Sequence, residues 1–258
     1  MWLHPETESN VGTSPPLDPL LTNARSNPRG LQSSRQRPGR RFAPSAELTL
    51  DGTARAASAE LPGADDGLLV LREFQAPYGV PDLMVITGDP TPRRQRLRLN
   101  VPTLLNEVDA GIVSVAHSPA GATPQQIASR LRWAPSTVAR RVPSLVRSGA
   151  LVPLAGGRLA RPRQIRPIGT FYAVEMKMTE WRRAVRQCRT YRTWADSYLL
   201  VMSEVSATGR TGLVAEVRSD GGGLIIGGEW VLRPRHKPLT KARRLWTSEH
   251  VIAASRRG

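Results

Sequence analysis

The last third of the chain switches between two hydrophobic periods, and this switching limits the folds available to it. Residues 169–178, GTFYAVEMKM, alternate as a β-strand does, whereas residues 179–196, TEWRRAVRQCRTYRTWAD, place apolar side chains at helical spacing after an expected Thr179 cap. Three further strand-like runs follow: SYLLVM, GLVAEV and GLIIGG. Strands that alternate with a helix favour an α/β layered domain.

An earlier segment, residues 66–92, also predicts strands. It holds a short apolar run, a turn with Pro and Gly, and a second apolar run, Leu83 to Ile86, which suits a buried strand. A Pro- and Arg-rich stretch, GDPTPRRQRLR, then predicts a linker. This linker divides two different kinds of sequence, residues 66–92 and residues 101–162.

Residues 101–162 predict three helices and a hairpin. VPTLLNEVDAGIVSVA predicts the first helix, Thr123 caps the second, and Ser136 caps a third that Gly149 ends. Pro143 predicts that the third helix is kinked or shorter than this. Gly156-Gly157 suits a tight hairpin turn. This order resembles a winged helix-turn-helix of the MarR or ArsR kind, so we expect an inserted DNA-binding domain.

Charge gives an independent indication of the partner. The chain carries 37 Lys+Arg against 21 Asp+Glu, a net charge of +16, and between Thr123 and Pro167 there are nine arginines and no acidic residue. This predicts contact with DNA; a solvated basic face is the alternative. The resemblance implies a third helix in the major groove and a hairpin tip near the minor groove. The residues then expected to contact DNA are Ser136, Thr137, Arg140, Arg141 and Arg158.

A second set of polar residues lies in the α/β part. It consists of Asp82 in VPDL, Glu175 and Lys177 in Glu-Met-Lys, and Gln187 and Tyr191 four residues apart. Together these resemble the PD-(D/E)XK, or restriction-endonuclease-like, nuclease superfamily, and the QxxxY element points to its RecB-type branch. The fold of that family is a mixed sheet flanked by helices, in which the Asp lies at one end of a hairpin strand and the Glu-x-Lys lies on the next strand. The resemblance therefore implies one domain made of residues 66–92 and 168–232 that is interrupted by residues 101–162. Asp82 and Glu175 are 93 positions apart, a larger separation than is usual in that family, and the inserted winged helix accounts for most of it.

The resemblance implies a metal-dependent phosphodiesterase site. Asp82, Glu175 and the backbone carbonyl of Met176 would hold Mg²⁺ (or Mn²⁺), a hard cation that takes oxygen ligands. Lys177 would orient water or stabilise charge, which arginine does poorly because its guanidinium is bulky and always protonated. Only three of the cations are lysine, and Lys177 is the only one in the first 236 residues. Further site residues are Gln187 and Tyr191, as positioners of DNA, and Glu73, an acidic residue where such nucleases carry one on their first helix. Packing is the alternative for Tyr191.

The remaining segments and the composition limit the protein class. Residues 1–60 predict a disordered basic arm, and the basic tail, residues 233–258, predicts either phosphate contacts or a solvated helix. The single cysteine, Cys188, excludes disulfide-stapled and zinc-finger classes. No export signal, membrane span or organic cofactor motif is recognisable, so we expect a cytoplasmic, nucleoid-associated protein.

Two functions from different classes fit these features. The first is a Mg²⁺-dependent DNA endo- or exonuclease that the inserted winged helix targets. The second is a DNA-binding regulator whose nuclease-like domain is inactive and serves as a clamp or as the interface of a homodimer. RNA binding through the Arg-rich arm is a third possibility, although no base-stacking motif supports it.

Overall fold

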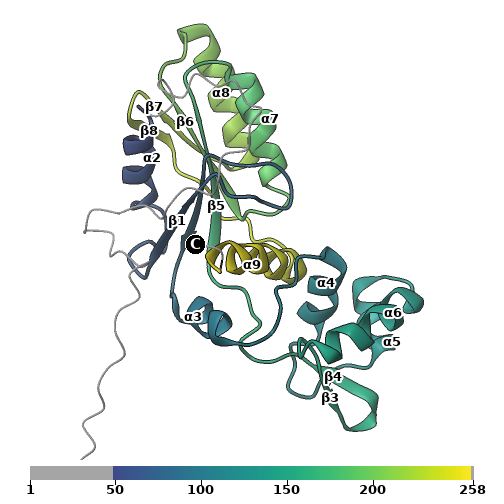
Figure 1. The fold of residues 1–258 in the computed structure, drawn as a ribbon. Helices are drawn as coiled ribbons and strands as arrows, with labels where there is room; N and C mark the ends of the chain where they lie inside the picture. Colours follow the sequence, from purple (N-terminus) through teal and green to yellow (C-terminus); the bar gives the residue numbers. More distant parts are fainter. Residues whose placement is uncertain (1–48, 257–258) are drawn as a thin grey trace, which may run out of the picture.

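A six-stranded mixed sheet forms the centre of the computed structural model, which describes residues 49–256 (Figure 1). The strand order is β1-β2-β5-β6-β7-β8; β5, β6 and β7 are parallel, and the other neighbours are antiparallel. The strands are β1 (Leu68–Arg72), β2 (Leu83–Thr87), β5 (Thr170–Lys177), β6 (Ser197–Met202), β7 (Gly223–Ile226) and β8 (Glu229–Leu232). The expected α/β class with a mixed sheet is confirmed.

Helices cover both faces of this sheet. On one face lies α2 (Asp51–Ser58), and on the other lie α7 (Trp181–Tyr191), α8 (Ala207–Asp220) and part of α9 (Lys241–Ser255) (Figure 1). Side chains of β5 alternate between the two cores: Phe171 and Ala173 pack toward α7, whereas Tyr172 and Val174 pack toward α2. Glu175 and Lys177 therefore belong to the α7 face.

Between β2 and β5 the chain forms four helices and a small hairpin. They are α3 (Thr91–Arg98), α4 (Glu107–Val115), α5 (Pro124–Leu131), α6 (Pro135–Arg147), β3 (Val152–Leu154), the one-turn helix η1 (Ala155–Gly157) and β4 (Arg158–Ala160). Helices α4 to α6 and the hairpin share a core of their own; we call residues 101–162 the helical insertion. The expected order of three helices and a hairpin is confirmed.

Local signals in the helical insertion have mixed outcomes. The Thr123 capping box is present, and Gly156 and Gly157 both have positive φ at the hairpin turn. However, Ser136 is not a cap, because α6 begins at Pro135 with Ala134 as its N-cap residue. The helix also continues through Pro143. Pro143 has no N–H to donate to the Ala139 carbonyl, four residues earlier. Both residues are exposed, so water can bind that carbonyl.

Several expectations outside the helical insertion are wrong. Residues 51–58 form α2 instead of disordered chain, and the rest of the predicted arm, residues 1–48, lies outside the described residues. The predicted linker contains α3, in which Arg93 and Arg96 are buried. The run GLVAEV lies in α8, where Leu213 and Val217 are buried four residues apart. Thr179 does not cap α7, which follows Glu180 in a left-handed conformation.

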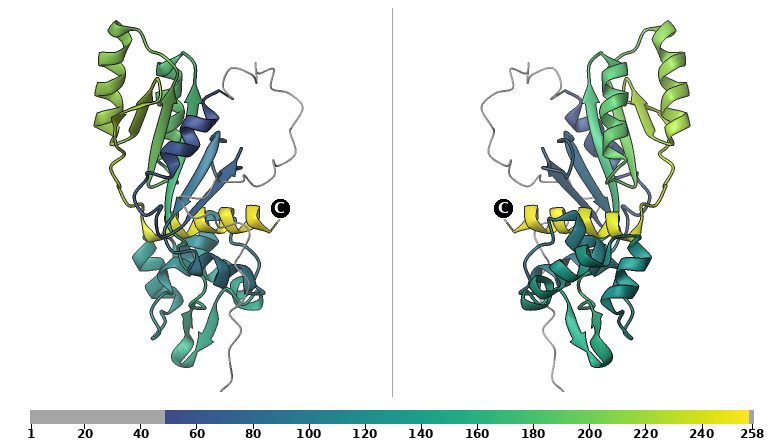
Figure 2. Two further views of the ribbon diagram at one scale, coloured as in Figure 1. Left: turned by 90° about the vertical axis from the view of Figure 1, so that its left-hand side faces the viewer. Right: turned by 90° about the vertical axis from the view of Figure 1, so that its right-hand side faces the viewer.

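The basic tail is not a solvated helix, because α9 is largely buried. Figure 2 shows it lying between the sheet and the helical insertion. Its residues Leu245 and Trp246 belong to the core of the helical insertion, whereas Val251 and Ile252 belong to the core of the sheet. Glu249, between them, is fully buried and binds Arg96 of α3. Helix α9 therefore joins the two cores.

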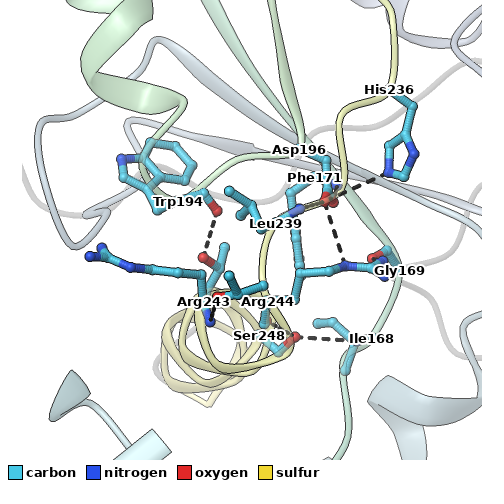
Figure 3. Close-up of polar contacts among 12 residues, drawn as sticks. Ile168, Gly169, Phe171, Trp194, Asp196, His236, Leu239, Arg243, Arg244 and Ser248 are labelled. Carbon is cyan, nitrogen blue, oxygen red and sulfur yellow. Dashed lines mark hydrogen bonds and ion pairs between the residues drawn. The ribbon is translucent and has the colours of Figure 1, made fainter. Parts of the chain in front are cut away.

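Buried Asp196 attaches the first turns of α9 to the sheet (Figure 3). Its carboxylate accepts hydrogen bonds from the Phe171 amide at 3.0 Å and the Leu239 amide at 3.3 Å, and Arg244 Nε lies 3.5 Å away. The Thr247 hydroxyl donates to the Trp194 carbonyl at 2.6 Å. These contacts fix the position of the helical insertion relative to the sheet.

No helix among residues 49–256 is long and apolar enough to cross a membrane.

Candidate functional site

Asp82 and the Glu-Met-Lys sequence meet at one end of the sheet. Asp82 immediately precedes β2, and β2 pairs with β5 so that Leu83 lies opposite Val174. The Asp82 Oδ2 atom accepts a hydrogen bond of 2.7 Å from the Met176 amide. The antiparallel pairing thus places the Asp82 carboxylate beside the strand that carries Glu175 and Lys177, although the helical insertion separates them in the sequence.

Glu175 is the most enclosed member of this group, with 2% of its surface exposed. Its Oε1 atom lies 3.1 Å from Lys177 Nζ, and its Oε2 atom accepts a 2.8 Å hydrogen bond from the Tyr191 hydroxyl. Tyr191 comes from the last turn of α7. We call Asp82, Glu175, Lys177 and Tyr191 the strand-end cluster.

The negative charge of this cluster is incompletely neutralised. Burial raises the pKa of Glu175, the nearby Asp82 carboxylate raises it further, and Lys177 and Tyr191 lower it only in part, so that the pKa is about 7. Burial and the same carboxylates raise the pKa of the Tyr191 phenol, which therefore stays a hydrogen-bond donor. A cation placed between the two carboxylates would relieve their repulsion.

Lys177 already supplies one positive charge here. Its Nζ atom donates to the Met176 carbonyl at 3.0 Å and pairs with Glu175, so the ammonium group lies beside two of the three oxygen ligands that the sequence predicts. Carboxylate and carbonyl oxygens suit Mg²⁺ or Mn²⁺. Across residues 49–256 no group of three His, Cys, Asp or Glu side chains is arranged to hold a metal, so such a site would rest on two carboxylates and the carbonyl oxygen of Met176.

Gln187 and Tyr191 occupy neighbouring turns of α7. The Gln187 Oε1 atom is buried and has no hydrogen-bond partner in the described part of the chain. Tyr191 is both packed and hydrogen-bonded, because its ring centroid lies 5.5 Å from that of Trp194 while its hydroxyl donates to Glu175. Cys188, between them, is fully buried, and burial raises the pKa of its thiol well above the usual range.

Glu73 does not lie on a helix, contrary to the expectation. It directly follows β1, is exposed, and has a φ of +45°. Its amide donates to the Asp82 carbonyl at 3.0 Å, so its backbone closes the β1–β2 hairpin beside the cluster. The helix that precedes β1, α2, covers the opposite face of the sheet.

The residues expected to contact DNA divide into two groups. Ser136 and Arg140 are exposed on α6. Arg141 instead binds Asp109 of α4 through two contacts of 2.7 and 2.5 Å, and this carboxylate raises the pKa of Arg141. Thr137 is half-buried, and Arg158 at the hairpin donates to the Ala120 carbonyl at 3.1 Å.

The exposed side of α6 includes residues that the sequence reasoning did not select. Ser136, Ala139, Arg140, Pro143, Ser144 and Arg147 are all exposed and follow helical spacing. The complementary positions Val138 and Leu145 are buried. The apolar period of α6 marks its buried side, so the positions opposite the apolar residues could have identified this exposed stripe.

Comparisons with protein-family models, with curated proteins and with solved structures gave no match. The functional interpretation therefore rests on the geometry of these residues.

Proposed function

We propose that the protein is a metal-dependent DNA nuclease with a restriction-endonuclease-like domain and an inserted winged helix. The observation that carries this proposal is the convergence of Asp82, Glu175 and Lys177 at one end of the sheet. These are the residues that the PD-(D/E)XK resemblance selects. Asp82 also immediately precedes strand β2 of the β1–β2 hairpin and Glu175 lies on the adjacent strand β5, as that family leads one to expect.

The donor set of the cluster supports the chemistry. Asp82, Glu175 and the Met176 carbonyl would hold the metal ion. A bound Mg²⁺ supplies charge neutralisation at the phosphate and lowers the pKa of a bound water. Lys177 Nζ orients the attacking water or stabilises charge on the phosphate. The Tyr191 hydroxyl fixes the Glu175 carboxylate, and Gln187 Oε1 is a buried acceptor without a hydrogen-bond partner among the described residues.

The helical insertion supports DNA as the substrate. The exposed stripe of α6 carries Arg140 and Arg147 among small side chains, Ala139, Pro143 and Ser144, so its backbone can approach a major groove closely. Because α9 fixes the helical insertion to the sheet, we propose that DNA bound to α6 lies in one orientation relative to the strand-end cluster.

A specific observation favours a second candidate, a non-catalytic winged-helix regulator. Lys177 Nζ contacts both Glu175 and the Met176 carbonyl, so the cluster can be partly neutralised without a metal. In that case the cluster would stabilise the fold and only the helical insertion would act on DNA.

Cleavage assays separate the two candidates. Purified protein is incubated with supercoiled plasmid, single-stranded DNA and branched DNA in Mg²⁺ or Mn²⁺, beside the Asp82→Asn variant. The nuclease proposal predicts cleavage of at least one substrate that the variant and EDTA abolish. Absence of cleavage with retained DNA binding, or equal cleavage by the variant, would overturn it in favour of the regulator.

A further inference from the structure

Two adjoining hollows surround the C-terminal end of α8, far from α6 in the sequence. Their volumes are about 390 and 360 Å³. Gly221 lines the second hollow, and Asp220, the residue before it, lines the first. Six cationic side chains line them: Arg189, Arg192, Arg218, Arg233, Arg235 and Lys237.

Only two of these cations are neutralised. Arg189 pairs with Glu216 and Asp220, and Arg233 pairs with Glu60. The other four make no ion pair with any residue from 49 to 256: Arg192, Arg218, Arg235 and Lys237. We call these four the α8-end cations.

The fold itself does not require these charges to gather. A β-carbon placed on Gly221 would lie 3.6 Å from Arg235 Cβ and 3.8 Å from an Arg192 guanidinium nitrogen, so two of the four meet at one glycine. A helix C-terminus attracts cations. However, the Arg218 and Val217 carbonyls that end α8 already accept the Gly221 and Gly222 amides. Uncompensated like charges held together are unfavourable unless an anion binds them.

We propose that the α8-end cations bind the phosphate backbone of DNA, as a contact surface separate from α6. The inference rests on the proposed DNA partner and holds for the nuclease and the regulator alike. The hollows lie beside the start of β7, whereas the strand-end cluster lies at the end of β5. Through the strand pairing, Gly223 lies opposite Leu199 and Lys177 opposite Met202. This is about 10 Å along the strands and, because β6 lies between β5 and β7, about 10 Å sideways, so the separation is about 14 Å, which one DNA strand spans with about four phosphates.

The salt dependence of DNA binding tests the contact. The double variant Arg218→Gln/Arg235→Gln is compared with Arg218→Lys/Arg235→Lys, which keeps both charges. Each lost phosphate contact lowers the slope of log K against log salt by about 0.9. We therefore expect the Gln pair to lower the slope by about 2 and the Lys pair to leave it nearly unchanged. An unchanged slope in the Gln pair overturns the proposal.

Site-directed crosslinking locates the DNA. The single cysteine of the chain, Cys188, is buried, so an introduced surface cysteine is selectively alkylated by azidophenacyl bromide. Arg235→Cys should crosslink to duplex DNA on illumination. Asp66→Cys, exposed just before β1 at the opposite sheet edge, should not. Equal crosslinking at both positions overturns this inference while leaving the proposed function intact. Lack of DNA binding by the original chain, or binding of RNA alone, overturns both.

Discussion

Two buried ion pairs in this protein differ in the balance of their charges. In the first, Arg96 and Glu249 are fully buried, and the guanidinium binds both carboxylate oxygens at 2.8 and 2.7 Å. Its remaining donors reach the Val101 and Pro102 carbonyls, and Glu249 also accepts the Leu104 amide. In the second, Glu175 lies 3.1 Å from Lys177 Nζ and accepts the Tyr191 hydroxyl, Lys177 Nζ also donates to the Met176 carbonyl, and a second carboxylate, Asp82, lies beside them.

We interpret the first pair as structural and the second, under the proposed function, as part of the reactive site. A buried pair in which each side-chain nitrogen and oxygen has a hydrogen-bond partner holds α3, α9 and the start of the helical insertion together. The strand-end cluster instead keeps two carboxylates near a single ammonium group, which raises the pKa of Glu175. Perturbed groups of this kind gather at functional sites. Removing members of the two pairs should therefore have different consequences for activity and stability.

The largest expected effect is on catalysis, in the variant Lys177→Ala. Loss of the ammonium group should lower the rate of DNA cleavage by about 10²- to 10³-fold, because charge near the phosphate is no longer stabilised. Lys177 ends the central strand β5 and its side chain is only 12% exposed, so its removal also leaves buried Glu175 without its charge partner and should lower the melting temperature. Initial rates and thermal unfolding are measured together. A loss of activity that merely follows a loss of folded protein would contradict this assignment.

Breaking the Arg96–Glu249 pair should instead destabilise the fold. Glu249→Gln leaves a buried guanidinium without its charge partner, which costs about 3–5 kcal/mol of unfolding free energy. Urea denaturation measures this cost. The double variant Arg96→Met/Glu249→Leu is the control, since replacing both charges should recover most of the loss. A mild effect of Glu249→Gln would show that the pair does not hold the junction.

The pH dependence of stability should identify the unneutralised cluster. A carboxyl whose pKa rises on folding, here from 4.5 to about 7, binds more protons in the folded state. Its contribution to stability therefore falls as pH rises from about 4.5 to 7. In EDTA at pH 8, Glu175→Gln should be more stable than the original chain by of the order of 1–3 kcal/mol. Thermal unfolding of both proteins from pH 4 to 8 checks this. A Glu175→Gln variant that is less stable than the original chain at pH 8 would contradict it.

The smallest expected effects distinguish two neighbouring arginines of α6. Arg140→Gln should weaken DNA binding and lower its salt slope by about 1, with no change in stability. Arg141→Gln should cost roughly 0.2–1 kcal/mol of stability, because Arg141 binds Asp109 at a partly exposed site, and should affect DNA binding less. Weaker DNA binding by Arg141→Gln than by Arg140→Gln would contradict this and indicate that Arg141 contacts DNA.

The sequence was most informative where a local pattern decides the structure. Alternate residues of any β-strand point to the same face, so the shared face of Glu175 and Lys177 followed from their spacing of two once the strand was recognised. The Thr123 capping box and the Gly156-Gly157 turn are also local. Their geometry needs no partner from elsewhere in the chain.

Expectations failed where tertiary packing overrides local composition. Arg96 belongs to a strongly polar segment that reads as a linker, yet Glu249, 153 residues later, makes its burial favourable. The run GLVAEV is β-like by composition, but Leu213 and Val217 are spaced to bury one side of a helix. The Asp109 partner of Arg141 and the orphan oxygen of Gln187 likewise depend on contacts that no sequence period reveals.

Binding of Mn²⁺ to the protein tests the central claim that Asp82 and Glu175 form a metal site. The electron paramagnetic resonance signal of free Mn²⁺ is followed as the original chain, Asp82→Asn and Glu175→Gln are added. The claim predicts that the original chain removes about one equivalent of free Mn²⁺ and that each variant binds at least tenfold more weakly, a difference of about 1.4 kcal/mol. Mn²⁺ binding that is absent from the original chain, or unchanged in both variants, would contradict it.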